Sequence, residues 1–219
     1  MTPPRPRRER LCLFTRYPAP GTTKTRLIPK LGKKGAADLQ REMTTHIFYR
    51  VRALIPLRGV EIEIRYEGGT LCQMQQWLGA DMIFSPQKPG DIGRRMARAI
   101  GDASADGVDA TVIIGSDIPG ISTGILNRAF VRLKDNDIVL GPARDGGYYL
   151  IGIDARCLKN AVPALFNGID WGADTVLART LDVAGRLNLT HALLEPLADV
   201  DRPEDLVHWE KVAARSRTY

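Results

Sequence analysis

Cysteine and histidine are scarce in this sequence, and neither residue type forms a recognisable site. The 219 residues include 3 cysteines and 3 histidines. Cys12, Cys72 and Cys157 lie far apart and form no C-x-x-C pair, so the sequence favours neither a disulfide framework nor a zinc site. No Ser/His/Asp or Cys/His arrangement of a nucleophilic enzyme is recognisable. This cysteine usage is typical of a reducing compartment, and we expect a cytoplasmic protein.

Long apolar runs are also absent. No stretch approaches the ~18 consecutive apolar residues of a membrane helix, so we expect no membrane span. The opening residues, MTPPRPRRER, are basic and rich in proline, and no long apolar run follows them. This pattern argues against a secretory signal, and we expect residues 1–10 to form a disordered basic tail.

Positive charge is in excess, but the pattern of a nucleic-acid-binding protein is missing. The formal net charge is +6, and aromatic residues make up 6% of the chain. The aromatic residues do not alternate with lysine and arginine, and no nucleic-acid-binding motif is present. We therefore expect a small anionic ligand rather than nucleic acid.

Apolar runs alternate with amphipathic stretches along most of the chain. The runs predict strands at 11–17, 60–66, 81–84, 110–117, 137–143, 147–153 and 188–195. The amphipathic stretches predict helices at 32–54, 70–78, 91–103, 122–134, 171–186 and 202–216. Such alternation is typical of an α/β protein with a mostly parallel sheet between two helical layers. Residues 11–219 are therefore expected to form one domain of three α/β/α layers.

The stretch PGTTKTRL follows the first predicted strand and is the first candidate site. Gly21 permits an unusual backbone conformation, and Thr22 offers a hydroxyl group. Lys24 and Arg26 place two cations close together, as a di- or triphosphate would require. The spacing of a Walker A loop is absent. The alternative is a solvated basic turn.

Carboxylates follow several of the later strands. Asp117 ends the buried run ATVIIGSD, where a rigidly mounted oxygen ligand could hold a divalent cation; alternatively, it caps the next segment. Asp145, Gly146 and Gly147 separate two apolar runs and predict either a plain hairpin turn or a place where Asp145 binds a hydroxyl or a metal. Asp199 is a further candidate.

Two more stretches are candidates for ligand contact. Gly90 and Gly93 open the predicted helix 91–103, whose N-terminus could bind an anion, although Asp91 is also a good N-cap. Trp171 stands at the predicted start of another helix. It is either a core residue or a platform for a base or sugar.

Six motifs, in this order, resemble one known family. They are FTRYPAPGTTKTRLIPKLG, QKPGDIGRRM, IIGSDIPGI, DIVLGPARDGGYYLIGI, LFNGIDW and LADVDRPEDL. Together they resemble the bacterial glycosyltransferase-like proteins described as radical-SAM/selenodomain-associated transferases, within the nucleotide-diphospho-sugar transferase superfamily. The resemblance runs from about residue 11 to 207.

The resemblance implies a GT-A fold, with a nucleotide bound across the first half of the sheet and Mg²⁺ or Mn²⁺ bridging its phosphates. Lys24 and Arg26 match positions that contact phosphate, and Asp117 matches the position that holds the metal. Asp145 and the adjacent glycines match the acceptor side. Because the usual Asp-x-Asp is absent around Asp117, the second metal ligand is open between Asp145 and Asp199.

Two reactions and one binding role remain as alternatives. The first is glycosyl transfer from a nucleotide-diphosphate sugar to a small-molecule acceptor that the sequence does not specify, with Asp145 accepting a proton. The second is nucleotidyl transfer from an NTP with release of pyrophosphate, because KTRL is similar to the Lys-x-Arg-Leu of phospholactate guanylyltransferases. The third is a non-catalytic nucleotide-binding protein. All three require Lys24 and Arg26 to lie within a nucleotide's reach of Asp117.

Overall fold

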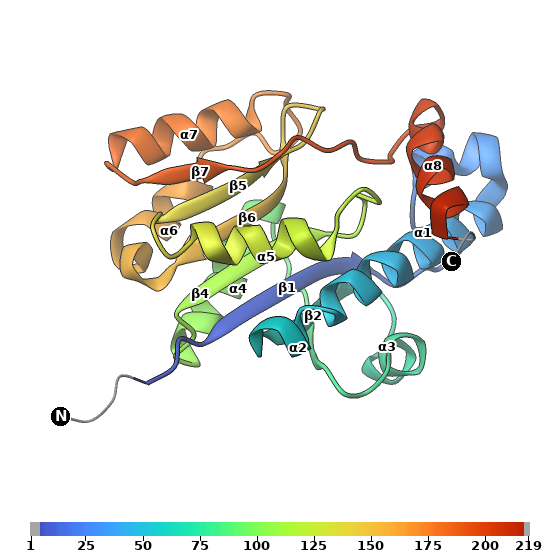
Figure 1. The fold of residues 1–219 in the computed structure, drawn as a ribbon. Helices are drawn as coiled ribbons and strands as arrows, with labels where there is room; N and C mark the ends of the chain where they lie inside the picture. The colour runs from blue at the N-terminus through green and yellow to red at the C-terminus, as the bar shows by residue number, and fades with distance from the viewer. Residues whose placement is uncertain (1–4, 217–219) are drawn as a thin grey trace.

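The computed structural model describes residues 5–216, with the side chains of 158–160, 215 and 216 left out. Its strands form one seven-stranded sheet in the order β3-β2-β1-β4-β6-β5-β7 (Figure 1). The strands are β1 (Glu9–Arg16), β2 (Glu61–Glu67), β3 (Ile83–Pro86), β4 (Ala110–Gly115), β5 (Ile138–Pro142), β6 (Tyr148–Asp154) and β7 (His191–Leu193). Only β6 runs antiparallel to its neighbours β4 and β5. The prediction of a mostly parallel sheet is confirmed.

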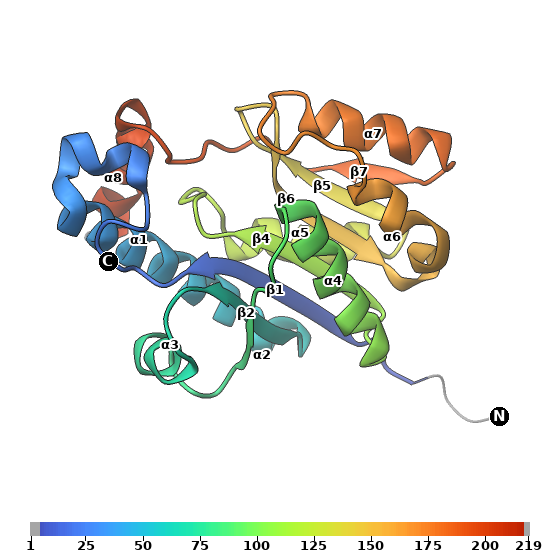
Figure 2. The ribbon, with the colours of Figure 1, turned by 180° about the vertical axis from the view of Figure 1, so that it is seen from behind.

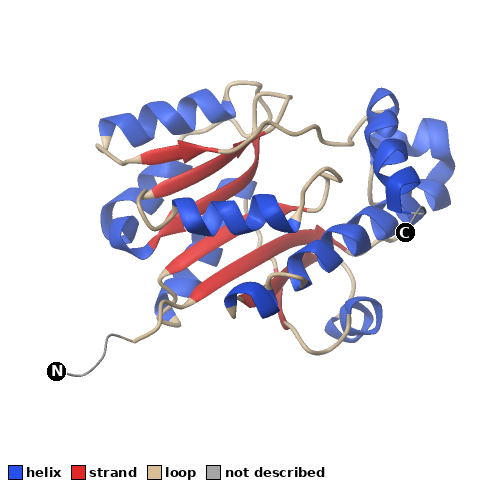
Figure 3. Ribbon diagram, in the orientation of Figure 1, coloured by secondary structure: helices blue, strands red, loops and turns tan. Residues whose placement is uncertain are grey.

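Helices cover both faces of this sheet (Figures 2 and 3). The helices are α1 (Ile28–Arg52), α2 (Ile55–Arg58), α3 (Leu71–Leu78), α4 (Ile92–Ala105), α5 (Thr123–Arg132), α6 (Leu158–Phe166), α7 (Val176–Arg186) and α8 (Leu206–Ser216). Alternate residues of β1 enter opposite cores. Leu11 and Leu13 pack with α1 and α5, whereas Cys12 and Phe14 pack with α4 and α6. Burying one such leucine stabilises the fold by roughly 1.5–3 kcal/mol.

Several helices differ from the sequence predictions. The first begins at Ile28 rather than at residue 32 and is kinked at Gly32, whose φ of 72° and ψ of 167° are not helical. Helices α2 and α6 were not predicted, and α8 begins at Leu206 instead of residue 202. Helix α7 begins at Val176 instead of residue 171, because residues 171–175 form turns that place Trp171 against the rest of the fold.

The predicted basic tail of residues 1–10 is largely ordered within the described range. Residues 1–4 lie outside that range, but Glu9 and Arg10 already belong to β1. Arg5 forms an ion pair with Asp109 at 2.7 Å, and Arg10 forms one with Glu61 at 2.7 Å. These partners come from distant segments, so the sequence pattern alone did not reveal them.

The charged face of β2 lies against α4 rather than in water. The side chains of Glu63 and Arg65 are 2% and 7% exposed and form an ion pair at 2.9 Å. Arg65 also pairs with Asp102 of α4 at 2.8 Å. Buried charges are tolerated when they are paired in this way.

The parallel strands bring the candidate residues to one edge of the sheet. The loops after β1, β4 and β5 all leave the sheet at this edge, and the segment between β7 and α8 crosses it (Figure 1). In open α/β sheets, ligands bind at the carboxyl ends of the strands. Among the helices of residues 5–216, none combines the length and the apolar character that crossing a bilayer requires.

Candidate functional site

Lys24 joins three segments of the chain at the carboxyl edge of the sheet. Its Nζ lies 2.5 Å from Asp117 Oδ1 and 2.9 Å from Asp201 Oδ1. It also donates a hydrogen bond to the Val200 carbonyl oxygen at 2.6 Å. Lys24 and Asp117 are therefore in direct contact, as every functional alternative required. We call this arrangement of Lys24, Asp117, Val200 and Asp201 the Lys24 clamp.

The clamp uses the whole donor capacity of Lys24. An ammonium group has three N–H donors, and three oxygens accept them here. The side chain is 4% exposed. Burial works against the charged form, but Asp117 and then Asp201 outweigh it, so the pKa of Lys24 is raised. In this arrangement Lys24 has no donor left for a phosphate, and the contact predicted for it would require the clamp to open.

Arg26 is the cation of this loop that remains accessible. Its side chain is 66% exposed, and Nη1 lies 3.6 Å from Asp201 Oδ2. Gly21 and Thr22, also predicted to contact phosphate, line neither cavity of the site. Gly21 has a φ of 86°, and the Thr22 hydroxyl donates to the Ala19 carbonyl at 3.1 Å. These two residues shape the turn.

A buried chain of polar side chains reaches Ser116, the residue before Asp117. Gln40 on α1 donates from Nε2 to the hydroxyl oxygens of Ser116 and Thr44, each at 3.0 Å. The Thr44 hydroxyl in turn lies 3.1 Å from that of Thr15 on β1. Sequence reasoning missed these residues. The detectable signal was two polar residues on the helix face that the apolar pattern assigns to the core.

Two adjoining cavities lie on either side of Asp117. The smaller, of about 480 Å³, is lined by residues at the ends of β1 and β2 and by the start of α4. The larger, of about 770 Å³, lies over the end of β4 and the start of β6. Both volumes fall in the range of small-molecule sites. The residues that line both cavities are Phe14, Arg26, Ile92, Gly115, Asp117 and Asp201.

Glu67 organises the charges of the smaller cavity. Its Oε2 accepts hydrogen bonds from Arg16 at 2.8 Å and from Arg95 at 2.9 Å. Arg95 also donates to Gln87 Oε1 at 3.1 Å. Burial favours the neutral form of Glu67, but the bonds from the two arginines outweigh it, so its pKa is lowered. None of these four residues was singled out from the sequence, because three separate segments bring them together.

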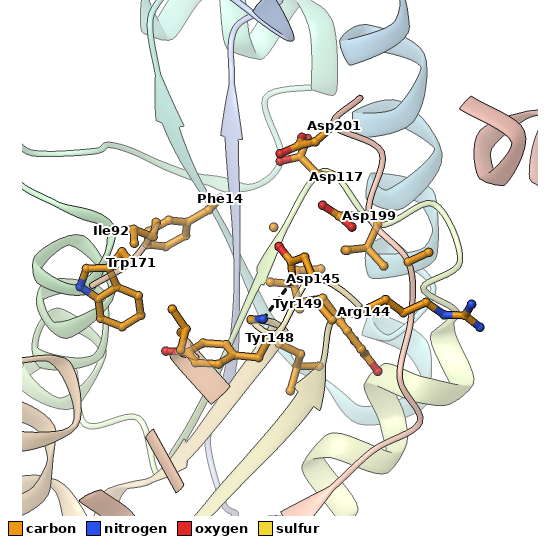
Figure 4. Close-up of a pocket in the computed structure, with 18 of the residues that line it drawn as sticks. Phe14, Ile92, Asp117, Arg144, Asp145, Tyr148, Tyr149, Trp171, Asp199 and Asp201 are labelled. Atoms are coloured by element: carbon orange, nitrogen blue, oxygen red, sulfur yellow. Dashed lines mark hydrogen bonds between the residues drawn. The ribbon is translucent and has the colours of Figure 1, made fainter. Parts of the chain in front are cut away.

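Asp145 and Asp199 face the larger cavity (Figure 4). Asp145 Oδ1 accepts a hydrogen bond from the Gly147 N–H at 2.9 Å. Burial raises the pKa of Asp199, and the charge of Asp145 raises it further. Among residues with described side chains, no cation pairs with either carboxylate. Figure 4 shows the guanidinium of Arg144 directed away from them.

The glycines and the tryptophan of the prediction have different positions. Trp171 and Gly147 line the larger cavity. Gly146 does not: a Cβ there would lie 1.9 Å from the Asp174 carbonyl oxygen, so it permits a close approach of two segments. Gly93, predicted as a phosphate contact, lies outside both cavities, because the Trp171 indole occupies the space next to it.

The described carboxylates do not form a complete cation site by themselves, but Asp117 fits one that is completed by other ligands. Within residues 5–216, no group of three or more His, Cys, Asp or Glu side chains is arranged to hold an ion. Mg²⁺, however, usually takes one or two protein carboxylates and completes its shell with water and phosphate oxygens. Asp117 lines both cavities and is 45% exposed, so it is accessible to such an ion.

Two comparisons show the family to which the chain belongs. Residues 51–173 match a family model described as "Uncharacterized protein conserved in bacteria (DUF2064)". The chain is also similar to a protein of Desulfovibrio desulfuricans G20 that is assigned to the nucleotide-diphospho-sugar transferases. The sequences are 33% identical, the match covers 92% of this chain and 85% of the other, and the TM-score is 0.84.

More distant solved structures share the fold alone. CMP:2-keto-3-deoxy-manno-octonic acid synthetase complexed with CTP is 12% identical, with a TM-score of 0.61, over 97% of this chain and 100% of the other. Glucosyl-3-phosphoglycerate synthase of Mycobacterium tuberculosis, in complex with Mn²⁺, UDP and glucosyl-3-phosphoglycerate, is 15% identical with a TM-score of 0.55. That match covers 95% of this chain and 78% of the other.

Part of the chain is also similar to a transcriptional regulator. The HTH-type transcriptional regulator IscR of Yersinia pestis is 31% identical over 111 residues, which cover 49% of this chain. The chain spans 66% of the length of that regulator. Half of the present chain has no counterpart in this match, so it indicates no function for the fold as a whole.

Proposed function

Because the chain belongs to the bacterial DUF2064 family and, with its Desulfovibrio relative, to the nucleotide-diphospho-sugar transferase superfamily, we propose that it transfers a glycosyl group from a nucleotide-diphosphate sugar to a small-molecule acceptor. Within the superfamily, the motifs support a place among the radical-SAM/selenodomain-associated transferases. One observation carries the proposal: Asp117 and Arg26 line both of two adjoining cavities. Such an arrangement suits a two-substrate transfer, because a diphosphate bound at the boundary would join the nucleoside in one cavity to the sugar in the other.

In this proposal, residues around the smaller cavity bind the nucleotide diphosphate and the cation. The nucleotide occupies the smaller cavity, and Arg26 binds its diphosphate through charge-assisted hydrogen bonds. The Lys24 clamp holds Asp117, whose carboxylate would be a ligand of a divalent cation that also binds the diphosphate. When bound, Mg²⁺ or Mn²⁺ neutralises the charge that develops on the leaving group. Asp199 or Asp145 is the candidate for a second carboxylate ligand.

The larger cavity then holds the sugar and the acceptor. The acceptor oxygen attacks the anomeric carbon, the bond from that carbon to the diphosphate oxygen breaks, and the nucleoside diphosphate leaves with the bonding electrons. Asp145 accepts the proton of the acceptor hydroxyl. Its Oδ1 is occupied by the Gly147 N–H, so Oδ2 takes this role.

Nucleotidyl transfer is the second candidate, since the Lys-x-Arg-Leu motif and the fold shared with a CTP-binding synthetase favour it. Both candidates use the same cations, but their products differ. In nucleotidyl transfer the α-phosphorus is attacked and pyrophosphate leaves. In glycosyl transfer the nucleoside diphosphate itself is released.

The experiment incubates the full chain and Mg²⁺ or Mn²⁺ with panels of NTPs and nucleotide-diphosphate sugars, in the presence of a bacterial small-molecule extract. Release of a nucleoside diphosphate is expected, and Asp117→Asn should abolish it. Asp182→Asn is the matched control, because Asp182 forms an exposed ion pair with Arg186 on α7. Pyrophosphate released from an NTP would replace the proposal by nucleotidyl transfer. Binding without either product would indicate a non-catalytic protein.

A further inference from the structure

The larger cavity has an apolar wall on which the proposed chemistry does not depend. Phe14, Ile92 and Trp171 lie together on one side of it, and Tyr148 lies below them (Figure 4). Met96 extends the same wall. The carboxylates of Asp145 and Asp199 lie on the other side. The cavity is therefore divided into an apolar half and an acidic half.

The apolar wall is held rigidly. The Trp171 ring stacks on Phe166 with a centroid distance of 6.2 Å and meets Tyr148 edge-on at 6.4 Å. Its indole also lies against Gly93, where an added Cβ would come within 2.4 Å of the ring. A preformed aromatic surface of this kind binds apolar rings with little ordering cost.

The acidic half has no counter-charge of its own. The basic residues that line the cavity are Arg26, Arg144, Arg202 and His208. Within the part of the chain whose side chains are described, none of them pairs with Asp145 or Asp199. Arg26 lines both cavities, and in the proposed complex its guanidinium is occupied by the diphosphate. An anionic group on the acceptor would therefore face Asp145 and Asp199, and at least one of these carboxylates has no cation beside it even if the other is a ligand of the proposed divalent ion.

We infer that the acceptor is an alcohol or amine with an aromatic or other apolar body and without a phosphate or carboxylate group. This inference rests on the proposed function, because it assigns the larger cavity to the acceptor. The apolar body would pack on Phe14, Ile92 and Trp171, and its hydroxyl or amino group would reach Asp145.

Saturation-transfer NMR tests this inference without any turnover. The protein is first saturated with Mg²⁺ and inorganic pyrophosphate, so that Arg26 no longer attracts anions. Four probes are then compared: 2-phenylethanol, 2-phenylethylamine, phenyl phosphate and glycerol. We expect the alcohol and the amine to bind at least tenfold more tightly than phenyl phosphate, and glycerol to give no signal.

Variants assign the binding to the two halves of the cavity. Trp171→Ala should weaken the binding of 2-phenylethanol at least tenfold. Trp77→Ala should leave this binding unchanged, because Trp77 packs beside Tyr17 away from the cavity. Ile92→Ser, at a side chain that is 39% exposed, repeats the test without disturbing the core. Asp199→Asn should strengthen the binding of phenyl phosphate several-fold, because it removes a negative charge from the acidic half.

Two results would overturn the inference: phenyl phosphate binding as tightly as 2-phenylethanol, or binding of the aromatic probes that neither Trp171→Ala nor Ile92→Ser weakens. Failure of the proposed function is separate from both. If no donor is ever turned over, the binding preference can still be measured. Transfer to phosphorylated acceptors alone would keep the proposed function and reject the inference.

Discussion

At the scale of single residues, Lys24 and Arg26 have different surroundings although one residue separates them. Lys24 is buried and contacts two carboxylates, while Arg26 is largely exposed and lines both cavities. The backbone explains the difference in part. Lys24 has a φ of 48°, in the left-handed region that a non-glycine residue rarely adopts. This conformation is maintained by the three contacts of the ammonium group.

Replacing Lys24 by methionine is expected to lower the free energy of unfolding by roughly 1–3 kcal/mol, because two carboxylates lose a buried partner. The expected loss in the free energy of unfolding is smaller than for a fully buried ion pair, because the side chains of Asp117 and Asp201 are 45% and 41% exposed. Urea denaturation measures it. Lys34→Met, which removes an ion pair whose lysine is 84% exposed, should change stability by less than about 0.5 kcal/mol. Equal stability of both variants would contradict a clamp.

Arg26→Ala should act on binding instead of stability. Losing a charge-assisted hydrogen bond to the diphosphate is expected to weaken nucleotide affinity by about 1–3 kcal/mol. Calorimetric titration with a nucleoside diphosphate and Mg²⁺ measures the affinity, and urea denaturation should show little change. Unchanged affinity would remove Arg26 from the phosphate site.

At the scale of secondary-structure elements, helix α4 performs two tasks. It covers the sheet with Met96, Ala99 and Ile100, and its first turn supports Trp171 through Gly93. Two glycines of this helix have opposite surroundings. Gly93 lies against the indole, whereas a Cβ at Gly101 would meet no atom within 4 Å.

This contrast predicts opposite effects for the same substitution. Gly101→Ala should stabilise the protein by up to about 1 kcal/mol, because alanine has the higher helix propensity. Gly93→Ala gains the same propensity but forces Trp171 from its place, so we expect a net loss of stability and a change in tryptophan fluorescence. Thermal unfolding followed by fluorescence measures both. If both variants were more stable than the wild type, this would contradict the close contact between the Trp171 indole and Gly93.

The charged face of β2 makes stability depend on pH. Burial favours neutral Glu61, but hydrogen bonds from Arg10 and Arg8 outweigh it, so the pKa of Glu61 is lowered in the folded state. The unfolded chain then binds the proton more readily, and this stabilisation is present above the unfolded pKa of about 4.3 and is lost as pH falls through the folded pKa. The stability difference between wild type and Glu61→Gln should therefore narrow between pH 6 and pH 3 in urea titrations. A constant difference would contradict the lowered pKa.

Sequence patterns predicted most elements because each pattern depends on neighbouring residues. The run ATVIIG reads as a buried strand wherever it stands, and β4 confirms this. The antiparallel direction of β6 and the contacts of Lys24 depend on segments far apart in the chain, so the local pattern could not reveal them. The same reason explains why Asp117 was found at a strand end while Glu67, Gln87 and Arg95 were missed.

At the scale of the whole molecule, the site is assembled from distant parts of the chain. A small core of Leu27, Met43 and Val200, packed against Leu206 and Trp209, fastens α8 beside the start of α1 (Figure 1). The candidate metal ligands Asp117, Asp145 and Asp199 come from the loops after β4 and β5 and from the segment before α8. No single element supplies a complete set of metal ligands.

Metal binding is therefore expected to depend on the nucleotide. Mn²⁺ alone should bind weakly, because within residues 5–216 no preformed group of three carboxylate, thiol or imidazole ligands exists. A nucleoside diphosphate should tighten Mn²⁺ binding at least tenfold by supplying phosphate oxygens. Electron paramagnetic resonance of free Mn²⁺ measures both states, with Asp117→Asn as the variant that should lose the increase. Tight Mn²⁺ binding without nucleotide would contradict this assembly.

The Lys24 clamp is also one of the last contacts that can form while the protein is being translated. The ammonium group bonds to Val200 and Asp201, which are 176 and 177 residues further along the chain. Translation must release both acceptors from the exit tunnel before the contact can close. Until then the first strands can pair and Lys24 can contact Asp117, but Val200 and Asp201 are still missing from the clamp. The contacts that hold Lys24 beside Asp117 are therefore completed only after the segment that carries Val200 and Asp201 has left the tunnel.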